Sequence, residues 1–339
     1  MIFYPFISAF LFALSIPFSK FLLKGIAELS LSAILYLSSF AFLFLIKLLT
    51  KNQETGLGRK DFPYLLLSIF FGGFLGPILM IFSLKYLSAS SVSLFANFEM
   101  IFTVIIAILF LGESKDLRFF LGFSLVIIGV SFLNFNLNTL NIELNKGILL
   151  ILASTFCWAL DNNFTAKISS RDPVSIAMFK GLGGGILSLF MAYFTGGLKS
   201  VSIHYFAGAV VCGILSYALS LFFLIYSIRE IGVSRTFTIF NSYPIFAFII
   251  SMLLFSEPLT LHIVFSFLAV TSGMILVIFS KHNHPHSHIL EHEHLHSHND
   301  FHHIHKHDEG DYFSPHTHNH FHNITHSHPH HNDIHHTHH

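Results

Sequence analysis

Apolar segments of about 20 residues follow one another from the start of the chain to residue 280. A helix of about this length crosses the roughly 30 Å hydrocarbon core of a bilayer, where every backbone polar group must be satisfied internally. Only 11% of the residues are charged, against roughly 25% in soluble domains. The sequence therefore predicts an all-α membrane protein with ten transmembrane helices, at about 2–23, 29–49, 63–86, 89–111, 117–134, 147–167, 173–195, 203–228, 233–256 and 260–280.

Composition argues against several other classes of protein. The formal net charge is zero, which disfavours binding to nucleic acid through a broad basic surface. The two cysteines, Cys157 and Cys212, lie in apolar stretches, so no disulfide framework or thiolate metal site is predicted. No nucleotide-binding motif or nucleophile triad is visible, so we expect neither an enzyme nor an ATP-driven pump. The N-terminus lacks a basic region and a clear cleavage site, which predicts a retained first helix.

The distribution of lysine and arginine predicts the orientation in the membrane. If the N-terminus is cytoplasmic, eleven basic residues in or near the loops fall on the cytoplasmic side and five on the outer side. Cytoplasmic loops are generally the ones enriched in these residues. We therefore expect both termini in the cytoplasm of a multi-pass protein of the plasma or inner membrane.

The two halves of the apolar region resemble one another. A shift of 144 positions aligns Asn97 with Asn241, Glu113 with Glu257 and Gly129 with Gly273. Near the start of each half, a slightly larger shift aligns Ala13, Leu14 and Phe18 with Ala159, Leu160 and Phe164. Because five helices is an odd number, the second copy must enter the membrane in the opposite orientation. Inverted repeats of this kind are common in alternating-access transporters, whose substrate site lies near the midplane between the copies.

Two stretches carry a family resemblance, Phe110-Leu111-Gly112-Glu113 and Leu254-Phe255-Ser256-Glu257-Pro258, each followed by a glycine-containing helix. Together with Asn241-Ser242-Tyr243-Pro244 and Phe156-Cys157-Trp158-Ala159-Leu160, they resemble the EamA-type members of the drug/metabolite transporter superfamily. The resemblance covers residues 1–280 and implies a carrier of small solutes. It implies a first five-helix repeat at 1–135 and a second at 147–280.

The chain departs from the family pattern in each half. The first half has Met100 where the second has Pro244, and Phe12-Ala13 where a Trp-Gly pair is expected. Ser256 replaces the glycine of the second Gly-Glu turn. The histidine-rich segment after residue 280 is not part of the general pattern.

Polar residues within the predicted helices are candidates for a transport site, because ionisable groups in mid-membrane are costly and generally functional. Glu99 and Asp161 are the acidic candidates, and they can line a polar cavity, bind a cation or exchange protons. Structural pairing of these carboxylates with Lys20 or Lys180 is the alternative. The full set of candidates is Asn97, Glu99, Asp161, Asn162, Asn163, Lys180, Asn241 and Tyr243. The glycine run 181–185 predicts close helix packing or a bend.

All but two of the 26 histidines, His204 and His262, lie after residue 280. Residues 281–339 are too polar to form a core, so we expect a disordered cytoplasmic tail. Neutral imidazoles bind transition metals such as Zn, Ni, Co and Cu(II), although a storage segment, a spacer or a pH sensor is also compatible with this composition. The predicted metal ligands are the alternating histidines His282, His284, His286, His288, His292, His294, His296, His298, His316, His318, His320 and His322.

The sequence favours a secondary transporter that moves a small solute or a divalent metal cation by alternating access, without a required cofactor. Two alternatives remain open at this stage. The protein can export a metabolite or amino acid while the tail only buffers metal, or it can be a membrane metal sensor without transport. The lipid bilayer and the small-molecule or metal-ion substrate are the expected partners.

Overall fold

The computed structural model describes residues 3–49, 55–111, 117–133, 135–136, 141–142, 145–231, 233–278, 283–296 and 316–329. The chain divides into two units, a helical unit within residues 1–280 and a second unit within residues 281–330. The two expected repeats both lie within the helical unit, and the second unit lies within the expected tail.

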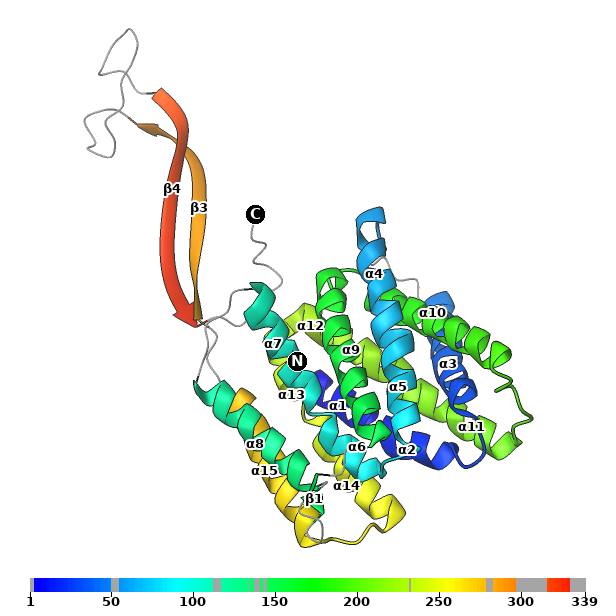
Figure 1. The fold of residues 1–339 in the computed structure, drawn as a ribbon. Coiled ribbons are helices and arrows are strands. Elements are labelled where there is room, and N and C mark those ends of the chain that lie inside the picture. The colour runs from blue at the N-terminus through cyan, green and yellow to red at the C-terminus, as the bar shows by residue number, and fades with distance from the viewer. Residues whose placement is uncertain are drawn as a thin grey trace. The chain divides into compact units, whose positions relative to one another are not determined.

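The described residues of the first half are mainly helical (Figure 1). Its elements are α1 (Phe3–Ala13), α2 (Ser15–Leu22), α3 (Glu28–Leu49), η1 (Arg59–Asp61), α4 (Phe62–Ser68), η2 (Ile69–Leu75), α5 (Gly76–Ser83), α6 (Ala89–Phe95), α7 (Phe98–Leu111) and α8 (Leu117–Leu133).

A two-stranded antiparallel pair follows α8, where β1 (Phe135–Asn136) pairs with β2 (Asn141–Ile142). The second half then repeats the helical succession. Its elements are α9 (Lys146–Ile168), α10 (Pro173–Phe194), α11 (Ile203–Cys212), η3 (Gly213–Leu219), α12 (Ser220–Ile231), α13 (Val233–Phe240), α14 (Tyr243–Phe255) and α15 (Leu261–Ile278).

Seven helical segments among the described residues are long and apolar enough to cross a membrane. The sequence predicts ten, and the other three fall on α6 with α7, α8 and α15. The α6–α7 segment is interrupted after Phe95, and the apolar parts of α8 and α15 are shorter. A helix of 17 residues such as α8 rises about 25 Å, less than the hydrocarbon core. The seven segments are Phe3–Leu22, Glu28–Leu49, Arg59–Ser83, Lys146–Ile168, Pro173–Phe194, Ile203–Ile231 and Thr236–Phe255.

The two halves share a local irregularity that the hydropathy pattern does not reveal. Both η2 and η3 are π-helical turns, and they lie 144 positions apart, at residues 69–75 and 213–219. In each, an N–H bonds to the carbonyl five residues earlier, Gly76 to Phe71 and Ser220 to Leu215. Such turns occur mostly as single turns within α-helices, and frequently at functional sites.

Helix breaks also recur at the same spacing. The α6–α7 break contains Asn97, whose side-chain amide donates to the Leu94 carbonyl at 3.0 Å. The α13–α14 break contains Asn241 and is followed by Pro244 at the start of α14. An asparagine side chain competes with the helical hydrogen-bond ladder, and a proline lacks the N–H that the ladder requires. The breaks leave α7 and α14 with their N-termini in the interior of the apolar region.

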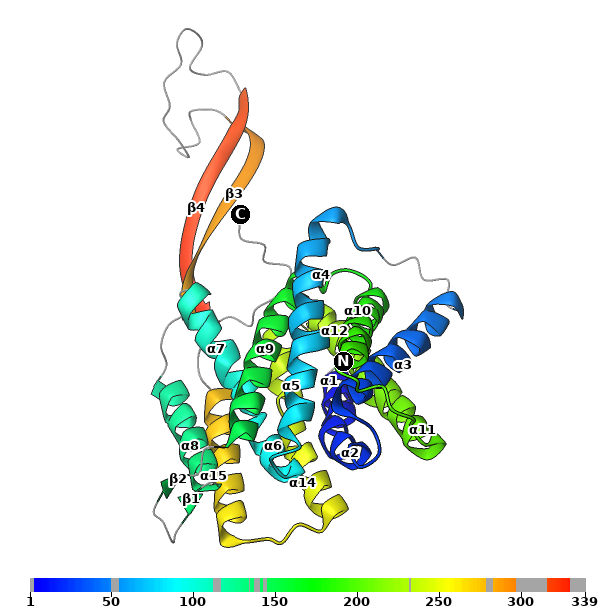
Figure 2. The same ribbon diagram turned by 45° about the vertical axis from the view of Figure 1, so that its right-hand side comes forward.

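The packing of the helices follows the same repeat. α1 packs on α12 while α9 packs on α5, and α3 packs on η3 while α10 packs on η2. Equivalent helices of the two halves also pack on each other, α3 on α10 and α8 on α15. The α8–α15 pair lies at one edge of the helical unit in both ribbon views (Figures 1 and 2).

The glycine run of α10 packs closely against neighbouring backbone. Close helix packing is one of the two roles that the sequence predicts for it. A Cβ at Gly184 would lie 2.0 Å from the Gly73 carbonyl oxygen of η2, and one at Gly181 would lie 3.0 Å from backbone atoms of α3. Small residues allow helices in a membrane to approach in this way. These contacts hold α10 against η2 and α3.

The tail differs from the expected disorder in its described parts. β3 (Asn283–His296) pairs antiparallel with β4 (His316–Pro329), with Asn283 opposite Pro329 and His296 opposite His316. Alternation of residue types with a period of two is compatible with extended backbone, which the sequence-based expectation did not consider. A single two-stranded hairpin is at best marginally stable in water.

Candidate functional site

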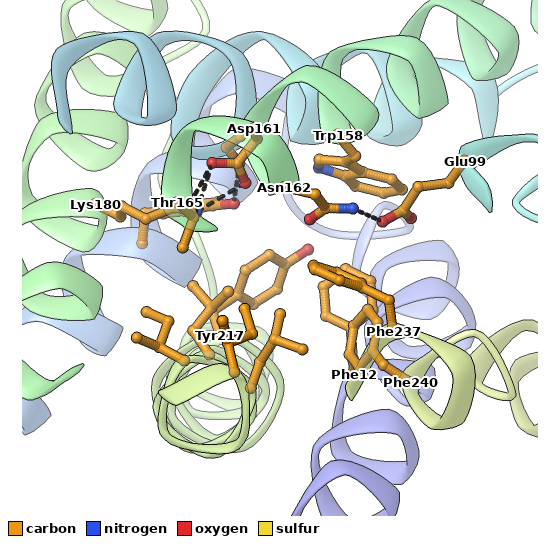
Figure 3. A pocket seen from close by; sticks show the side chains of 16 residues that line it. Phe12, Glu99, Trp158, Asp161, Asn162, Thr165, Lys180, Tyr217, Phe237 and Phe240 are labelled. Atoms are coloured by element: carbon orange, nitrogen blue, oxygen red, sulfur yellow. Dashed lines mark hydrogen bonds and ion pairs between the residues drawn. The ribbon is translucent and has the colours of Figure 1, made fainter. Parts of the chain in front are cut away.

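A pocket inside the helical unit is lined by both halves of the chain (Figure 3). Its walls come from α1, α3, η2 and α7 of the first half and from α9, α10, η3, α12 and α13 of the second. The lining combines a small polar group of side chains with aromatic and aliphatic ones. A concave, mostly apolar site with a few converging polar groups is typical of small-molecule binding.

Asp161 and Lys180 form an ion pair in the wall of this pocket. The Lys180 ammonium lies 2.8 Å and 2.7 Å from the two Asp161 carboxylate oxygens, and both side chains are buried. The Ser68 and Thr165 hydroxyls also donate to the carboxylate, at 2.6 Å and 2.9 Å. A buried ion pair is tolerated only when such further hydrogen bonds satisfy its remaining atoms.

Gly72 in the π-helical turn η2 makes room for this ion pair. A Cβ at this position would lie 1.9 Å from one Asp161 carboxylate oxygen, so no larger residue fits beside the carboxylate as it stands. The Gly72 carbonyl is held on its other side by the Tyr36 hydroxyl, which donates to it at 2.9 Å. The irregular turn thus shapes the polar end of the pocket.

Glu99 is the second acidic residue of the pocket, and it is 3% exposed. Its two carboxylate oxygens accept from the Asn162 amide at 2.7 Å and from the Tyr243 hydroxyl at 2.8 Å. The helix break places Glu99 in the first turn of α7, where the helix dipole favours a negative charge. Among the described residues, no Lys or Arg forms an ion pair with it.

Aromatic rings form the wall around Phe12. The Phe12 ring lies 5.7 Å from Trp158, 5.5 Å from Phe240 and 4.9 Å from Tyr243, measured between centroids. Phe12 and Trp158 are equivalent under the shift that aligns the starts of the two halves. Phe12, which stands where the family pattern expects a tryptophan, therefore meets the tryptophan of the second half at the pocket.

Four of the eight residues predicted for the transport site line this pocket: Glu99, Asp161, Asn162 and Lys180. Tyr243 contacts it through Glu99. The remaining three, Asn97, Asn163 and Asn241, do not line it. Asn97 and Asn241 lie at the helix breaks, and the Asn163 amide donates to the Ala159 carbonyl of its own helix at 2.8 Å.

The sequence left open whether Lys20 or Lys180 would pair with a buried carboxylate. Lys180 does, whereas the Lys20 ammonium donates to the carbonyls of Leu84 and Leu87 after the end of α5. A lysine at the C-terminal end of a helix satisfies carbonyls that lack an intrahelical partner. Lys20 therefore has a structural contact away from the pocket.

Sequence reasoning did not select several residues that complete the site. The Thr165 and Ser68 hydroxyls donate to Asp161. Tyr36 and Tyr217 line the pocket. Hydroxyl side chains are common in membrane helices, so their type alone does not distinguish them. The spacing of Thr165 from Asp161, four residues on one helix face, is the one signal that could have identified it.

Ten of the twelve predicted metal ligands of the tail lie on β3 and β4. His282 and His298 lie outside the described residues, and for the other ten the structure describes only the backbone of β3 and β4. Within the part of the chain whose side chains are described, no group of three or more His, Cys, Asp or Glu residues could hold a metal ion.

An ion pair joins the last turn of α3 to Asp172, which lies just outside the spanning segment formed by α10. The Lys47 ammonium lies 2.8 Å from the Asp172 carboxylate, which also accepts from the Val174 and Ser175 N–H groups at the start of the helix. Burial raises the pKa of Asp172, but Lys47 and Ser175 outweigh burial, so this pKa lies below its ordinary value of 3.8.

Comparisons with known proteins agree with this architecture. The model of the EamA-like transporter family matches the chain twice, at residues 1–135 and 145–279. An uncharacterized transporter of Methanothermobacter thermautotrophicus is 25% identical over 283 residues, which cover 78% of this chain and 80% of that protein. A solved crystal structure of a protein that is 12% identical superimposes with a TM-score of 0.62, over 81% of this chain and 94% of that one.

The last comparison supports the fold, and the first two support the class of protein. The match covers both halves of the helical unit, including every helix that lines the pocket. The chain carries two copies of the family's domain and is a multi-pass membrane protein, and it belongs to the EamA-like transporter family.

Proposed function

We propose that the protein is a secondary transporter of a small organic solute with a cationic amino group, which it binds in the pocket between the two repeats. One observation carries the proposal. Glu99 faces the pocket and forms no ion pair with a described Lys or Arg, while Lys180 is paired with Asp161. A buried carboxylate attracts a cation, and the aromatic rings beside it favour an organic ammonium group.

Alternating access through ten transmembrane helices is the proposed mechanism. The recurrence of the π-turns and of the helix breaks at a spacing of 144 residues supports two repeats of five helices in opposite orientations. Broken helices with interior N-termini are typical of the substrate sites of such transporters. Movement of one repeat against the other would expose the pocket to each side in turn.

Contacts on one side of the helical unit, beyond the pocket, support a conformation that is closed on that side. Near the end of α2, the Lys20 ammonium donates hydrogen bonds to the carbonyls of Leu84 and Leu87. On the same side, the Ser90 hydroxyl donates a hydrogen bond to the Glu257 carboxylate. The pocket extends the other way, toward the ends of α9 and α12, where Thr165 and Ile228 line it. We infer that the closed side is extracellular, because the basic residues predict cytoplasmic termini.

A divalent metal cation is the other cargo that the sequence suggested. The wall of the pocket is largely aromatic and aliphatic, and Asp161 is already engaged by Lys180. Divalent cations require several oxygen or nitrogen ligands. These features favour an organic solute as cargo, with a separate metal-buffering role for the tail.

The tail proposal rests on its sequence. Alternating histidines bind transition metals, and the helices that form the pocket lie before residue 280. Deletion of residues 282–339 should therefore abolish binding of Zn²⁺ to the purified protein, measured by calorimetry, and leave solute transport intact. Loss of transport upon this deletion would instead favour direct participation of the tail.

Counterflow in proteoliposomes tests the proposed function. The reconstituted protein is loaded with each member of a panel of amino acids, amines and divalent metal salts, and exchange of the labelled compound is measured. We expect exchange of at least one amino compound and none of the metals. Exchange of a metal alone would overturn the proposed cargo, and a metal sensor without transport would exchange nothing.

A further inference from the structure

Two ion pairs lie at opposite ends of α3. Glu28, in the first turn of this helix, lies 2.6 Å from the ammonium of Lys85, which follows α5. Lys47, in the last turn, lies 2.8 Å from the carboxylate of Asp172, which caps α10. A helix of 22 residues rises about 33 Å, so the two pairs lie at opposite ends of the spanning region.

The shift of 144 positions relates the residues of these pairs. It aligns Glu28 with Asp172, each at the start of a helix, and Lys85 with Arg229, near the ends of α5 and α12. The helices concerned pack in equivalent ways, α3 on α5 and α10 on α12. The first half joins its acidic and basic residue in an ion pair, and the second half carries the same two charges at the equivalent positions.

In the second half these two charges have other partners. Asp172 is joined to Lys47 of the first half. Arg229 lies 3.4 Å from Glu230 and over the ring of Tyr226, 5.1 Å from its centroid. Among the ion pairs of the described residues, none joins Arg229 to Asp172. Because Glu230 and Tyr226 belong to α12 as Arg229 does, a movement of the whole helix need not break these two contacts.

The two ends of the helical unit differ as a closed and an open side would. Ile228, next to Arg229, lines the pocket, whereas its equivalent Leu84 is not part of the lining. The Leu84 carbonyl instead accepts a hydrogen bond from the Lys20 ammonium, which joins the end of α2 to the end of α5. The end with the intact pair is therefore held together, and the pocket extends toward the end where the equivalent charges are apart.

We propose that the two ends exchange their pairing when access changes: Arg229 pairs with Asp172 as one side closes, and Glu28 separates from Lys85 as the other side opens. The exchange rests on the proposed alternating access, in which two repeats of one fold interchange their arrangements. Partly exposed ion pairs contribute little stability. Breaking one pair and forming its equivalent therefore leaves the two conformations close in free energy, as reversible access requires.

Labelling of a cysteine inside the pocket tests the exchange without a cargo. Leu224 of α12 lines the pocket, and Leu224→Cys is introduced into a background without the two native cysteines. An impermeant thiol reagent supplied on the Glu28 side reaches it only in the second conformation, so the labelling rate reports the population of that conformation. Lys85→Gln should raise this rate about two- to fivefold, and Arg229→Gln should lower it by a similar factor.

Three further variants separate the pairing from a general loosening of the helices. Lys24→Gln removes an exposed basic residue near the Glu28 end that forms no ion pair among the described residues, and it should leave the rate unchanged. Arg229→Lys keeps the charge and should restore the unmodified rate. In an Asp172→Asn background, Arg229→Gln should have no further effect, because its partner is already neutral.

The proposal is overturned if Arg229→Gln leaves the rate unchanged or raises it, or if it still lowers the rate in the Asp172→Asn background. Equal effects of Lys24→Gln and Lys85→Gln would overturn it as well. The outcome is separate from that of the proposed function, since no cargo is present. Counterflow in a protein that fails the labelling test refutes the exchange alone, and the expected labelling without counterflow of any compound refutes the proposed cargo alone.

Discussion

Glu99 and Tyr243 occupy equivalent positions in the two repeats, 144 residues apart, and the Tyr243 hydroxyl donates to the Glu99 carboxylate at 2.8 Å. Each residue lies in the first turn of a helix that begins after a break, α7 for Glu99 and α14 for Tyr243. The two interior helix N-termini therefore meet through one hydrogen bond. Because the repeats carry different residues here, this pair of equivalent positions supplies one carboxylate, that of Glu99, and one hydroxyl, that of Tyr243.

The Asp161–Lys180 pair should be structural in the sense that neither partner is tolerated alone. Asp161→Asn or Lys180→Met leaves one buried group without its partner, which should lower the free energy of unfolding by about 3–5 kcal/mol. The double variant should recover much of this loss, as measured by thermal unfolding in a double-mutant cycle. Glu28→Gln breaks the more exposed pair with Lys85 and should cost less than about 1 kcal/mol. Additive losses for Asp161 and Lys180 would contradict the pairing.

Gly72→Ala should distort the polar end of the pocket. Its Cβ would collide with the Asp161 carboxylate at 1.9 Å, so the carboxylate or η2 must shift, at a cost of about 1–3 kcal/mol. Solute exchange in proteoliposomes should fall together with thermal stability. Gly56→Ala is the control, because a Cβ at Gly56 meets nothing within 4 Å. Equal behaviour of the two variants would show that the close contact at Gly72 is unimportant.

Asp172 gives the protein a predicted dependence of stability on pH. Its pKa is lower in the folded protein than its ordinary value of 3.8, so its contribution is present above pH 4 and is lost as the pH falls through the folded pKa. Asp172→Asn should keep the helix cap and lose this pH-dependent part. Asp172→Ala should also lose the cap, at about 1 kcal/mol. Thermal unfolding between pH 3 and 7 checks both, and a pH-independent difference between the unmodified protein and Asp172→Asn would contradict the prediction.

The sequence predicted much of the framework because hydropathy and repetition act over long segments. The spacing of 144 residues, first seen at Asn97 and Asn241, also relates the π-turns and helix breaks. The sequence could not reveal those turns, since a shift from i−4 to i−5 hydrogen bonding leaves the apolar pattern unchanged. It also could not separate Asn162 from Asn163, because adjacent helical residues point about 100° apart and only the packing decides which faces the pocket.

The predicted orientation can be tested with single cysteines. Both native cysteines are buried, so a background with Cys157→Ala and Cys212→Ala suits the experiment. Gly56→Cys should be shielded from an impermeant thiol reagent in intact cells, whereas Lys199→Cys should react, because the two exposed positions are predicted to lie in loops on opposite sides. Labelling of Gly56→Cys alone would invert the orientation and place the tail outside.

The role of Glu99 is the central claim, and the single tryptophan of the chain, Trp158, provides a reporter inside the pocket. Glu99→Gln keeps the shape of the side chain and removes its charge. With the amino compound that exchanges best in counterflow, Trp158 fluorescence should give a Kd at least tenfold higher for Glu99→Gln, equivalent to about 1.4 kcal/mol. Glu230→Gln, which neutralises a carboxylate outside the pocket, should bind as the unmodified protein does. Unchanged affinity in a folded Glu99→Gln protein would contradict the account.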